Sequence, residues 1–216
     1  MAKKILLTFI ILLGLYYIFF LSHIDQSLKL IFKIIPMILI IVMAATQKVH
    51  SIKKYQLLIV IGLVFCMIGD YTLQWFLIGL TSFLIGHVFY IFAFSSTSEQ
   101  PVPTWAKVSL LVYGVLMASW IATTVFKSGE TVLAFAVLAY ISIILTMGWT
   151  ALRTGSIFAI IGALLFLASD SYLAINKFVM PLPFSHEVIM TTYYSAQLLI
   201  ALSILQYSEI RSKVVQ

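Results

Sequence analysis

Eight long apolar runs follow one another along almost the whole chain, and this pattern constrains the fold more than any other feature. A helix needs roughly 20 mostly apolar residues to cross a bilayer, so eight such helices with short connections use up nearly all 216 residues. We therefore predict an all-α fold, a polytopic membrane helical bundle with about eight transmembrane helices. The runs are approximately Ile5–Leu21, Leu30–Ala45, Tyr55–Trp75, Ile78–Phe94, Val108–Phe126, Thr131–Gly148, Ile157–Ile175 and Glu187–Tyr207.

The composition also indicates a membrane protein. Hydrophobic residues make up 62% of the chain and charged residues only 9%, whereas roughly a quarter of an ordinary soluble domain is charged. A water-soluble globule of this composition would expose large apolar patches and aggregate. Because eight spans leave no length for a soluble domain, we predict a single integral membrane domain over residues 1–216.

The basic residues predict an orientation in the membrane. They lie between the apolar runs and not in a patch with interleaved aromatic residues, so the net charge of +6 does not indicate nucleic-acid binding. With a cytoplasmic N-terminus, eight spans place nine Lys and Arg residues on the cytoplasmic side and four on the other, as the positive-inside rule expects. Seven spans would move Arg211 and Lys213 outside and weaken this bias. We therefore expect a multi-pass protein of a bacterial inner membrane with both termini in the cytoplasm.

The N-terminus resembles the start of a signal peptide, because Lys3 and Lys4 precede an apolar run. No small-x-small cleavage site follows this run, where the sequence reads Ser22-His23-Ile24-Asp25. We therefore expect a retained first span, with a signal anchor as the alternative.

Two of the runs resemble each other around an acidic residue. Ile61-Gly62 precedes Gly69-Asp70 in the third run, and Ile161-Gly162 precedes Ser169-Asp170 in the seventh. In both runs a leucine follows the aspartate by three residues. Because four helices separate the two segments, a duplication would give a parallel four-helix internal repeat. Chance similarity in a leucine-rich background is the alternative.

Asp70 and Asp170 are the acidic residues that fall inside apolar runs. A carboxylate at membrane depth costs about 3 kcal/mol, and such residues usually face the bundle interior and have a function or a partner. The other acidic residues fall in predicted loops or at run ends, where water can reach them: Asp25, Glu99, Glu130, Glu187 and Glu209.

The positions of the two aspartates predict a shared site. Counted from the start of each run, Asp70 and Asp170 lie at similar heights in the outer half of the bilayer. Two carboxyl groups in one cavity would leave one protonated and one ionised near neutral pH, which is what a general acid and a general base need. We therefore predict Asp70 and Asp170 as catalytic residues. The alternative is that each aspartate only satisfies a nearby hydroxyl or amide.

Eight further polar residues are predicted to bind the substrate. Gln74 follows Asp70 by one helical turn, and Lys177 follows Asp170 by two turns, where its ammonium could meet a lipid phosphate. An ordinary interface anchor is the alternative for Lys177, and a hydrogen-bonded structural role is the alternative for His87. The full set is His87, Tyr90, Gln74, Asn176, Lys177, Tyr193, Tyr194 and Gln197.

The last third of the chain carries a family resemblance. The segments Ser169–Phe178, Pro181–Ser185 and Met190–Ser203 resemble the lysoplasmalogenase (YhhN-like) integral membrane family. Gly69-Asp70, Gly86-His87-Val88-Phe89-Tyr90 and Gly148-Trp149 match motifs that the family carries earlier in its chain. The likeness covers the third to the eighth run, and the first two runs match only in hydropathy.

This resemblance implies an eight-helix hydrolase that cleaves the vinyl ether bond of lysoplasmalogens, which are 1-alkenyl-glycerophosphoethanolamine or -glycerophosphocholine lipids. The implied products are a fatty aldehyde and the glycerophospho-headgroup. The resemblance also places Asp70 and Asp170 at the active site. We hypothesise that one is the protonated general acid and the other the ionised base, as two carboxyl groups divide these roles in glycoside hydrolysis. The sequence does not distinguish which is which.

Other functions need features that differ from these. An intramembrane aspartyl protease would carry Gly-x-Gly-Asp, whereas Met67-Ile68 precede Gly69-Asp70. A metal-dependent hydrolase needs more ligands than His87 and His186, so we predict no metal and no cofactor. A proton-coupled transporter or a lipid-binding protein remains the alternative, because buried carboxylates also relay protons. The expected partners are a lysophospholipid substrate and membrane lipids, with no nucleic acid, and the sequence gives no indication of the oligomeric state.

Overall fold

The fold consists of α-helices throughout the part of the chain that the computed structural model describes, which is residues 2–21, 25–49, 52–97 and 100–214. Residues 22–24, where a signal-peptide cleavage site was sought, lie outside these ranges. Eight helices and no strand occur within them, which confirms the predicted all-α class. The helices are α1 (Ala2–Phe20), α2 (Gln26–Ala45), α3 (Lys53–Thr72), α4 (Phe76–Ser95), α5 (Thr104–Lys127), α6 (Thr131–Leu152), α7 (Ile157–Phe178) and α8 (Ser185–Val214).

Seven of these helices are long and apolar enough to cross a membrane, judged on the described residues. The apolar part of α1, Lys4–Phe20, is shorter than the other seven. The chain is therefore a multi-pass integral membrane protein built as a helical bundle. The connection between the third and fourth helices is as tight as predicted and consists of residues 73–75, whereas α8 extends beyond the predicted run at both ends.

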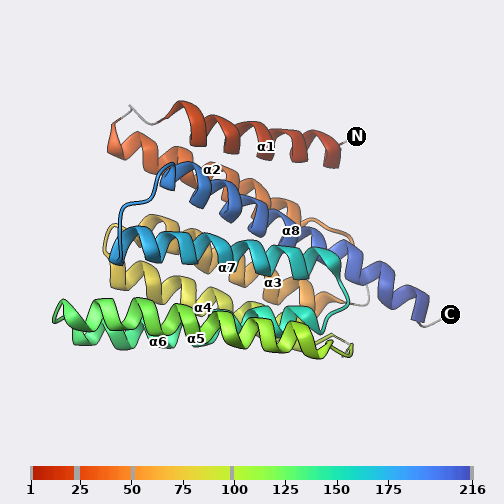
Figure 1. The fold of residues 1–216 in the computed structure, drawn as a ribbon. Coiled ribbons are helices and arrows are strands. Elements are labelled where there is room, and N and C mark those ends of the chain that lie inside the picture. The colour runs from red at the N-terminus through yellow and green to blue at the C-terminus, as the bar shows by residue number, and fades with distance from the viewer. Residues whose placement is uncertain (1, 22–24, 50–51, 98–99, 215–216) are drawn as a thin grey trace.

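Successive helices run in opposite directions, and the two chain ends marked in Figure 1 lie at the same end of the bundle. The aspartate-bearing helices α3 and α7 therefore point the same way. The pair α1–α2 lies at one edge of the bundle and the pair α5–α6 at the opposite edge, with α3, α4, α7 and α8 between them (Figure 1). Which end faces the cytoplasm stays a prediction, as does the membrane in which the protein resides.

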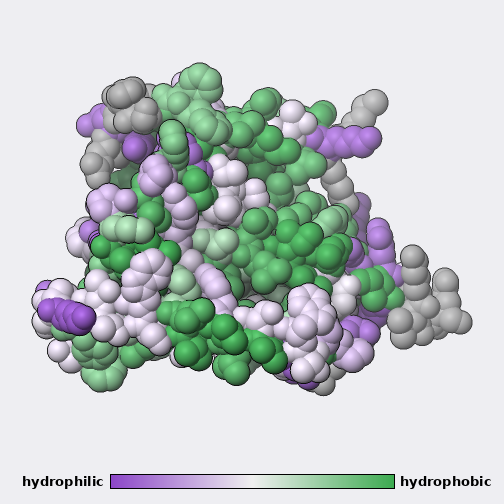
Figure 2. Space-filling view, viewed as in Figure 1, coloured by the Kyte–Doolittle hydropathy of each residue, from purple (hydrophilic) through white to green (hydrophobic). Residues whose placement is uncertain are grey.

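The outer surface of the bundle is largely apolar. Figure 2 shows hydrophilic residues gathered toward the two ends of the molecule, with hydrophobic side chains between them. Large apolar side chains in the middle of helices are strongly exposed, including Leu12 (58%), Leu111 (67%) and Leu116 (64%). Lipid chains would solvate such side chains, whereas water would not. The surface therefore fits a bilayer.

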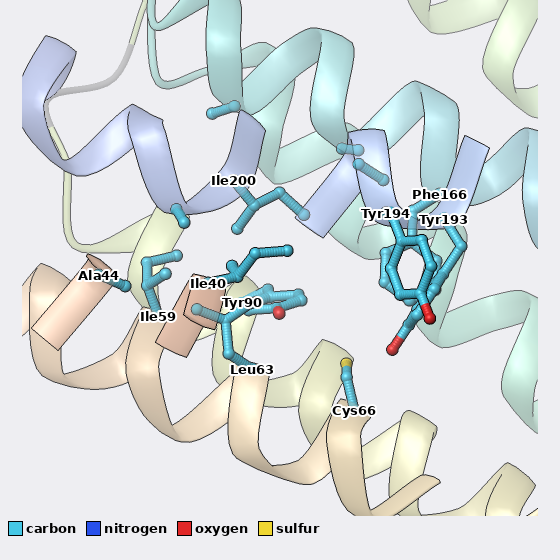
Figure 3. Packing of buried hydrophobic residues seen from close by; sticks show 14 of the residues in the cluster. Ile40, Ala44, Ile59, Leu63, Cys66, Tyr90, Phe166, Tyr193, Tyr194 and Ile200 are labelled. Atoms are coloured by element: carbon cyan, nitrogen blue, oxygen red, sulfur yellow. The ribbon is translucent and has the colours of Figure 1, made fainter. Parts of the chain in front are cut away.

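Two groups of buried side chains hold the bundle together. The main core joins α1–α4 to α6, α7 and α8, and Figure 3 shows Ile40, Ile59, Leu63 and Ile200 packing together in it. A second group, the α5–α6 cluster, contains Ile121, Val125, Ala134 and Val137. Leu80 on α4 packs against both groups.

Close helix contacts explain the glycines that the two aspartate-bearing helices share. A methyl group at Gly62 would lie 2.6 Å from Cδ1 of Tyr90 and 3.1 Å from the carbonyl oxygen of Gly86, so α3 and α4 cross with little space between their backbones. A methyl group at Gly162 would lie 3.1 Å from the carbonyl oxygen of Ala196, so α7 and α8 cross in the same way. Small residues permit such close approaches in membrane bundles. The internal repeat stays a prediction.

Gly62→Ala is expected to lower the stability of the folded protein. The new methyl group overlaps the ring of Tyr90, and overpacking costs about 1–3 kcal/mol, which the higher helix propensity of alanine offsets by only about 1 kcal/mol. Thermal unfolding in a fixed detergent measures the change. Gly148→Ala is the matched control, because its methyl group would lie 3.7 Å from the nearest side-chain atom, in Leu110. An equal effect of the two substitutions would contradict the close crossing.

Candidate active site

A cavity of about 230 Å³ lies inside the bundle, and all eight helices contribute to its wall. Both predicted catalytic residues, Asp70 and Asp170, line it. Most of the lining is apolar, which is typical of sites that bind lipid-like ligands and orient them with a few polar groups. The polar or titratable lining residues are Tyr17, Lys33, Asp70, Tyr113, Tyr140, Ser169, Asp170, Ser171, His186 and Tyr193.

Asp70 lies near the end of α3 and is almost completely buried, with 3% of its surface exposed. A methyl group on the preceding residue, Gly69, would lie 2.7 Å from the ring of Phe83, so α3 packs tightly on α4 at this point. The Oδ1 atom of Asp70 lies 3.0 Å from Nζ of Lys33. Its Oδ2 atom accepts a hydrogen bond of 2.6 Å from the hydroxyl of Tyr193. The Asp70 carboxyl group is thus in contact with one cation, Lys33, and one hydrogen-bond donor, Tyr193.

Lys33 belongs to α2 and brings a positive charge into the bundle. Besides the ion pair, its Nζ atom donates to the backbone oxygen of Asp70 at 3.3 Å, and its side chain is only 13% exposed. The hydroxyl of Tyr194 donates to the backbone oxygen of Lys33 at 2.7 Å, which ties α8 to α2. The consecutive residues Tyr193 and Tyr194, side by side in Figure 3, therefore fix the two members of one ion pair.

Asp170 has different surroundings. Its Oδ2 atom accepts a hydrogen bond from the hydroxyl of Tyr140 on α6. Among the described residues, no basic side chain forms an ion pair with it. The neighbouring Ser171 shares a hydrogen bond with Tyr113 on α5. Asp170 is half-buried and, within the described ranges, lacks the neighbouring cation that Asp70 has.

The two carboxyl groups therefore differ in chemical character although they line the same cavity. Asp70 is stabilised as an anion by Lys33 and Tyr193. Asp170 has the tyrosine hydroxyl as its partner and can hold a proton on its other oxygen. One neutral acid and one carboxylate are the two components of general acid–base catalysis. No group of three or more His, Cys, Asp or Glu side chains in the described ranges is arranged to hold a metal ion.

The structure brings one of the predicted substrate-binding residues, Tyr193, to the cavity wall, whereas three others lie behind it. Tyr90 donates to Oε1 of Gln197 at 2.6 Å, and both side chains are fully buried. The ring of His87 packs 4.5 Å from the ring of Phe166. Neither ring nitrogen of His87 has a hydrogen-bond partner among the described residues. These three residues are fully buried and do not line the cavity.

The remaining predicted residues lie toward the helix ends. Asn176 accepts a hydrogen bond of 2.8 Å from the backbone N–H of Leu182 and so shapes the α7–α8 connection. The ammonium of Lys177 lies 4.4 Å from the centre of the Phe76 ring. Phe76 lines the cavity, whereas Lys177 does not. Gln74 is exposed and donates only to the backbone oxygen of Tyr71. Tyr194 does not line the cavity and donates a hydrogen bond to the backbone oxygen of Lys33. Substrate contacts of all eight residues stay predictions.

Sequence analysis did not identify Lys33 or Tyr140 as site residues. Lys33 lies inside an apolar run, as the two aspartates do, and this signal could have identified it. Tyr140 is one of 11 tyrosines, and its position in the sixth run did not distinguish it from the others. Tyr17 and His186, whose rings lie 5.3 Å apart, also line the cavity without having been predicted.

Comparison with known proteins identifies relatives of this chain. The model of the YhhN family matches residues 28–204. Lysoplasmalogenase TMEM86B from Homo sapiens is 39% identical over 148 residues, which cover 67% of this chain and 62% of the human protein. Lysoplasmalogenase TMEM86A from Bos taurus is 34% identical, with 70% of this chain and 66% of the bovine protein covered.

A bacterial relative is more distant. Lysoplasmalogenase from Mycobacterium tuberculosis is 28% identical over 169 residues, which cover 74% of this chain and 65% of the mycobacterial protein. The chain therefore spans less than two thirds of the length of these relatives. No solved structure matches the chain significantly.

Lys33→Met is expected to destabilise the protein, because it leaves the Asp70 carboxylate buried without its cation. Breaking a buried ion pair from one side costs about 3–5 kcal/mol, and adding Asp70→Asn to the same chain should recover most of this loss. Thermal unfolding in detergent measures both variants. Lys29→Met, one helical turn earlier on α2, removes a lysine without an ion pair among the described residues and serves as the control. If the double variant were no more stable than Lys33→Met, the ion pair would not be the cause.

Proposed function

The chain belongs to the YhhN family, and from that premise we propose that it hydrolyses the vinyl ether bond of lysoplasmalogens by acid–base catalysis with Asp70 and Asp170. The products are a fatty aldehyde and a glycerophosphoethanolamine or glycerophosphocholine. The names of the human, bovine and mycobacterial relatives support the substrate class. The observation that carries the proposed mechanism is the unequal pair of carboxyl groups in one largely apolar cavity.

Asp170 is the general acid in this proposal. Its neutral carboxyl group gives a proton to the outer alkene carbon of the vinyl ether, and the electron pair of the double bond forms the new C–H bond. The positive charge that develops is shared between the inner carbon and the ether oxygen. The Asp70 carboxylate stabilises this oxocarbenium ion, as the second carboxylate does in glycoside hydrolysis. Tyr140 orients Asp170 by donating to Oδ2, which leaves Oδ1 for the proton.

Asp70 is the general base in the second step. It removes a proton from a water molecule as the water oxygen bonds to the cationic carbon, which gives a hemiacetal. The hemiacetal collapses when its hydroxyl returns a proton to Asp170 and the proton on Asp70 moves to the departing glycerol oxygen. Both carboxyl groups then regain their starting states, and the net change is one water added and one C–O bond broken.

The headgroup lies at the membrane surface in this proposal. Lys177 is placed for the phosphate, because its ammonium lies over the ring of Phe76, which itself lines the cavity. His186 at the start of α8 also lines the cavity, and its Nε2 atom is buried without a partner among the described residues. By the positive-inside rule this end of the bundle faces away from the cytoplasm, and both termini are cytoplasmic. The membrane is a bacterial inner membrane.

Asp170→Asn is expected to reduce aldehyde release from lysoplasmalogen by about 10³-fold, because the amide cannot supply the proton. Asp70→Asn should be similarly inactive. Aldehyde is measured with purified protein in detergent, where no proton gradient exists, so turnover there also excludes a gradient-driven transport function.

Glu130→Gln is the matched control for the aspartate variants, because Glu130 is exposed at the start of α6 and its side chain makes no capping hydrogen bond. It should retain full activity. Monodisperse elution of each variant shows that it is folded. Full activity of folded Asp170→Asn would exclude Asp170 as the acid.

A further inference from the structure

The cavity has a polar side and an apolar side. Lys33, Asp70, His186 and Tyr193 come from α2, α3 and α8. The lining from α5 and α6 is almost entirely apolar, and its polar members Tyr113 and Tyr140 are both hydrogen-bonded to residues of α7. The apolar side of such a cavity accepts apolar ligands.

The apolar side also extends deeper into the bundle than Asp70 and His186 do. Ile144 and Leu145 lie 13 and 14 residues after the start of α6, and Gly114 lies 13 residues before the end of α5. At 1.5 Å per residue these residues are about 20 Å from the helix ends near which Asp70 and His186 lie. The cavity therefore reaches from one end of the bundle toward the bilayer midplane.

The apolar side of the cavity lies where two packed regions meet. Ile144 and Leu167 belong to the main core, and Ile121 and Val137 belong to the α5–α6 cluster. All four side chains line the cavity and are at least nine-tenths buried. Buried apolar surface that faces a cavity on one side lacks dispersion contacts, which a filling hydrocarbon would supply.

We propose that the space between the main core and the α5–α6 cluster is a binding slot for the hydrocarbon chain of the substrate, and that Gly114 and Leu145 set the chain length it accepts. This inference rests on the proposed function for the identity of the lipid. The vinyl ether lies at the two aspartates in this proposal, and the headgroup lies at the polar end of the cavity. The hydrocarbon chain of the substrate then extends along the apolar lining toward Gly114, Ile144 and Leu145.

Gly114 controls the inner end of this slot through Leu145. A methyl group at Gly114 would overlap Cδ1 of Leu145 and lie 3.2 Å from Cδ2, so the leucine side chain has to move. Leu145 itself lines the cavity, and its displacement shortens the slot. The flexible end of a leucine can give way without disrupting α5 or α6, so the fold should tolerate the substitution.

Gly114→Ala is therefore expected to discriminate between chain lengths. Aldehyde release from a long-chain lysoplasmalogen should fall about tenfold, because the chain end overpacks the shortened slot, while release from a short-chain lysoplasmalogen stays within about twofold. The double variant Gly114→Ala/Leu145→Ala should restore aldehyde release from the long-chain substrate, because it removes the leucine atoms that the new methyl group displaces. Gly148→Ala, on α6 with no close contact, should leave both chain lengths unaffected.

Binding of saturated 1-alkyl lysophospholipids separates this inference from the proposed function, because these probes lack the vinyl group and cannot be hydrolysed in this way. Weaker binding of the long-chain probe to Gly114→Ala, with the short-chain probe unaffected, supports the slot even if the wild type releases no aldehyde. An equal effect on both probes, or no effect on the long-chain probe, overturns the slot even if the wild type hydrolyses lysoplasmalogen.

Discussion

The buried ion pair between Lys33 and Asp70 organises the interior of this protein. It joins α2 to α3, and the hydroxyls of Tyr193 and Tyr194 on α8 hold its two members in place. A charge pair inside a bilayer is tolerated only where the surrounding groups satisfy it. In the proposed mechanism the ion pair stabilises Asp70 as the carboxylate, and Asp170, which has a tyrosine as its partner, is the neutral acid. The position of one lysine therefore distinguishes the surroundings of the two carboxyl groups.

The cavity lies where α5 meets the rest of the bundle. The main core is continuous through α1–α4, α6, α7 and α8, whereas the buried side chains Ile121 and Val125 of α5 belong to a separate cluster. A gap between two well-packed regions is compatible with a stable fold, because each region keeps its own contacts. The bundle can therefore contain a large space beside the aspartates without weakening the helices that hold them.

The sequence was sufficient to predict the helices of the described residues and the position of Asp70 and Asp170 inside the bundle, because a carboxyl group stands out in an apolar run. Tyr193, which lines the cavity, was also among the predicted substrate-binding residues. Lys33 was counted only among the basic residues of the outer side, although it lies inside the predicted run Leu30–Ala45 and seven residues after the start of α2. Tyr140 and His186 reach the cavity through the way α6 and α8 are rotated in the bundle, and side-chain direction in a uniformly apolar helix has no periodic signal to reveal it. Tyr90 and Gln197 were chosen for their polarity, but they satisfy each other behind the cavity.

Each aspartate takes a partner from the helix that precedes its own in the chain, Lys33 on α2 for Asp70 and Tyr140 on α6 for Asp170. This arrangement bears on how the protein enters the bilayer during synthesis. The helix carrying the partner is made first, so each carboxyl group can be satisfied as soon as its own helix follows. Entry as hairpins, α2 with α3 and α6 with α7, would avoid exposing an unpartnered carboxyl group to lipid. The order of helices along the chain thereby lets each aspartate meet its partner during insertion, before the rest of the bundle has formed.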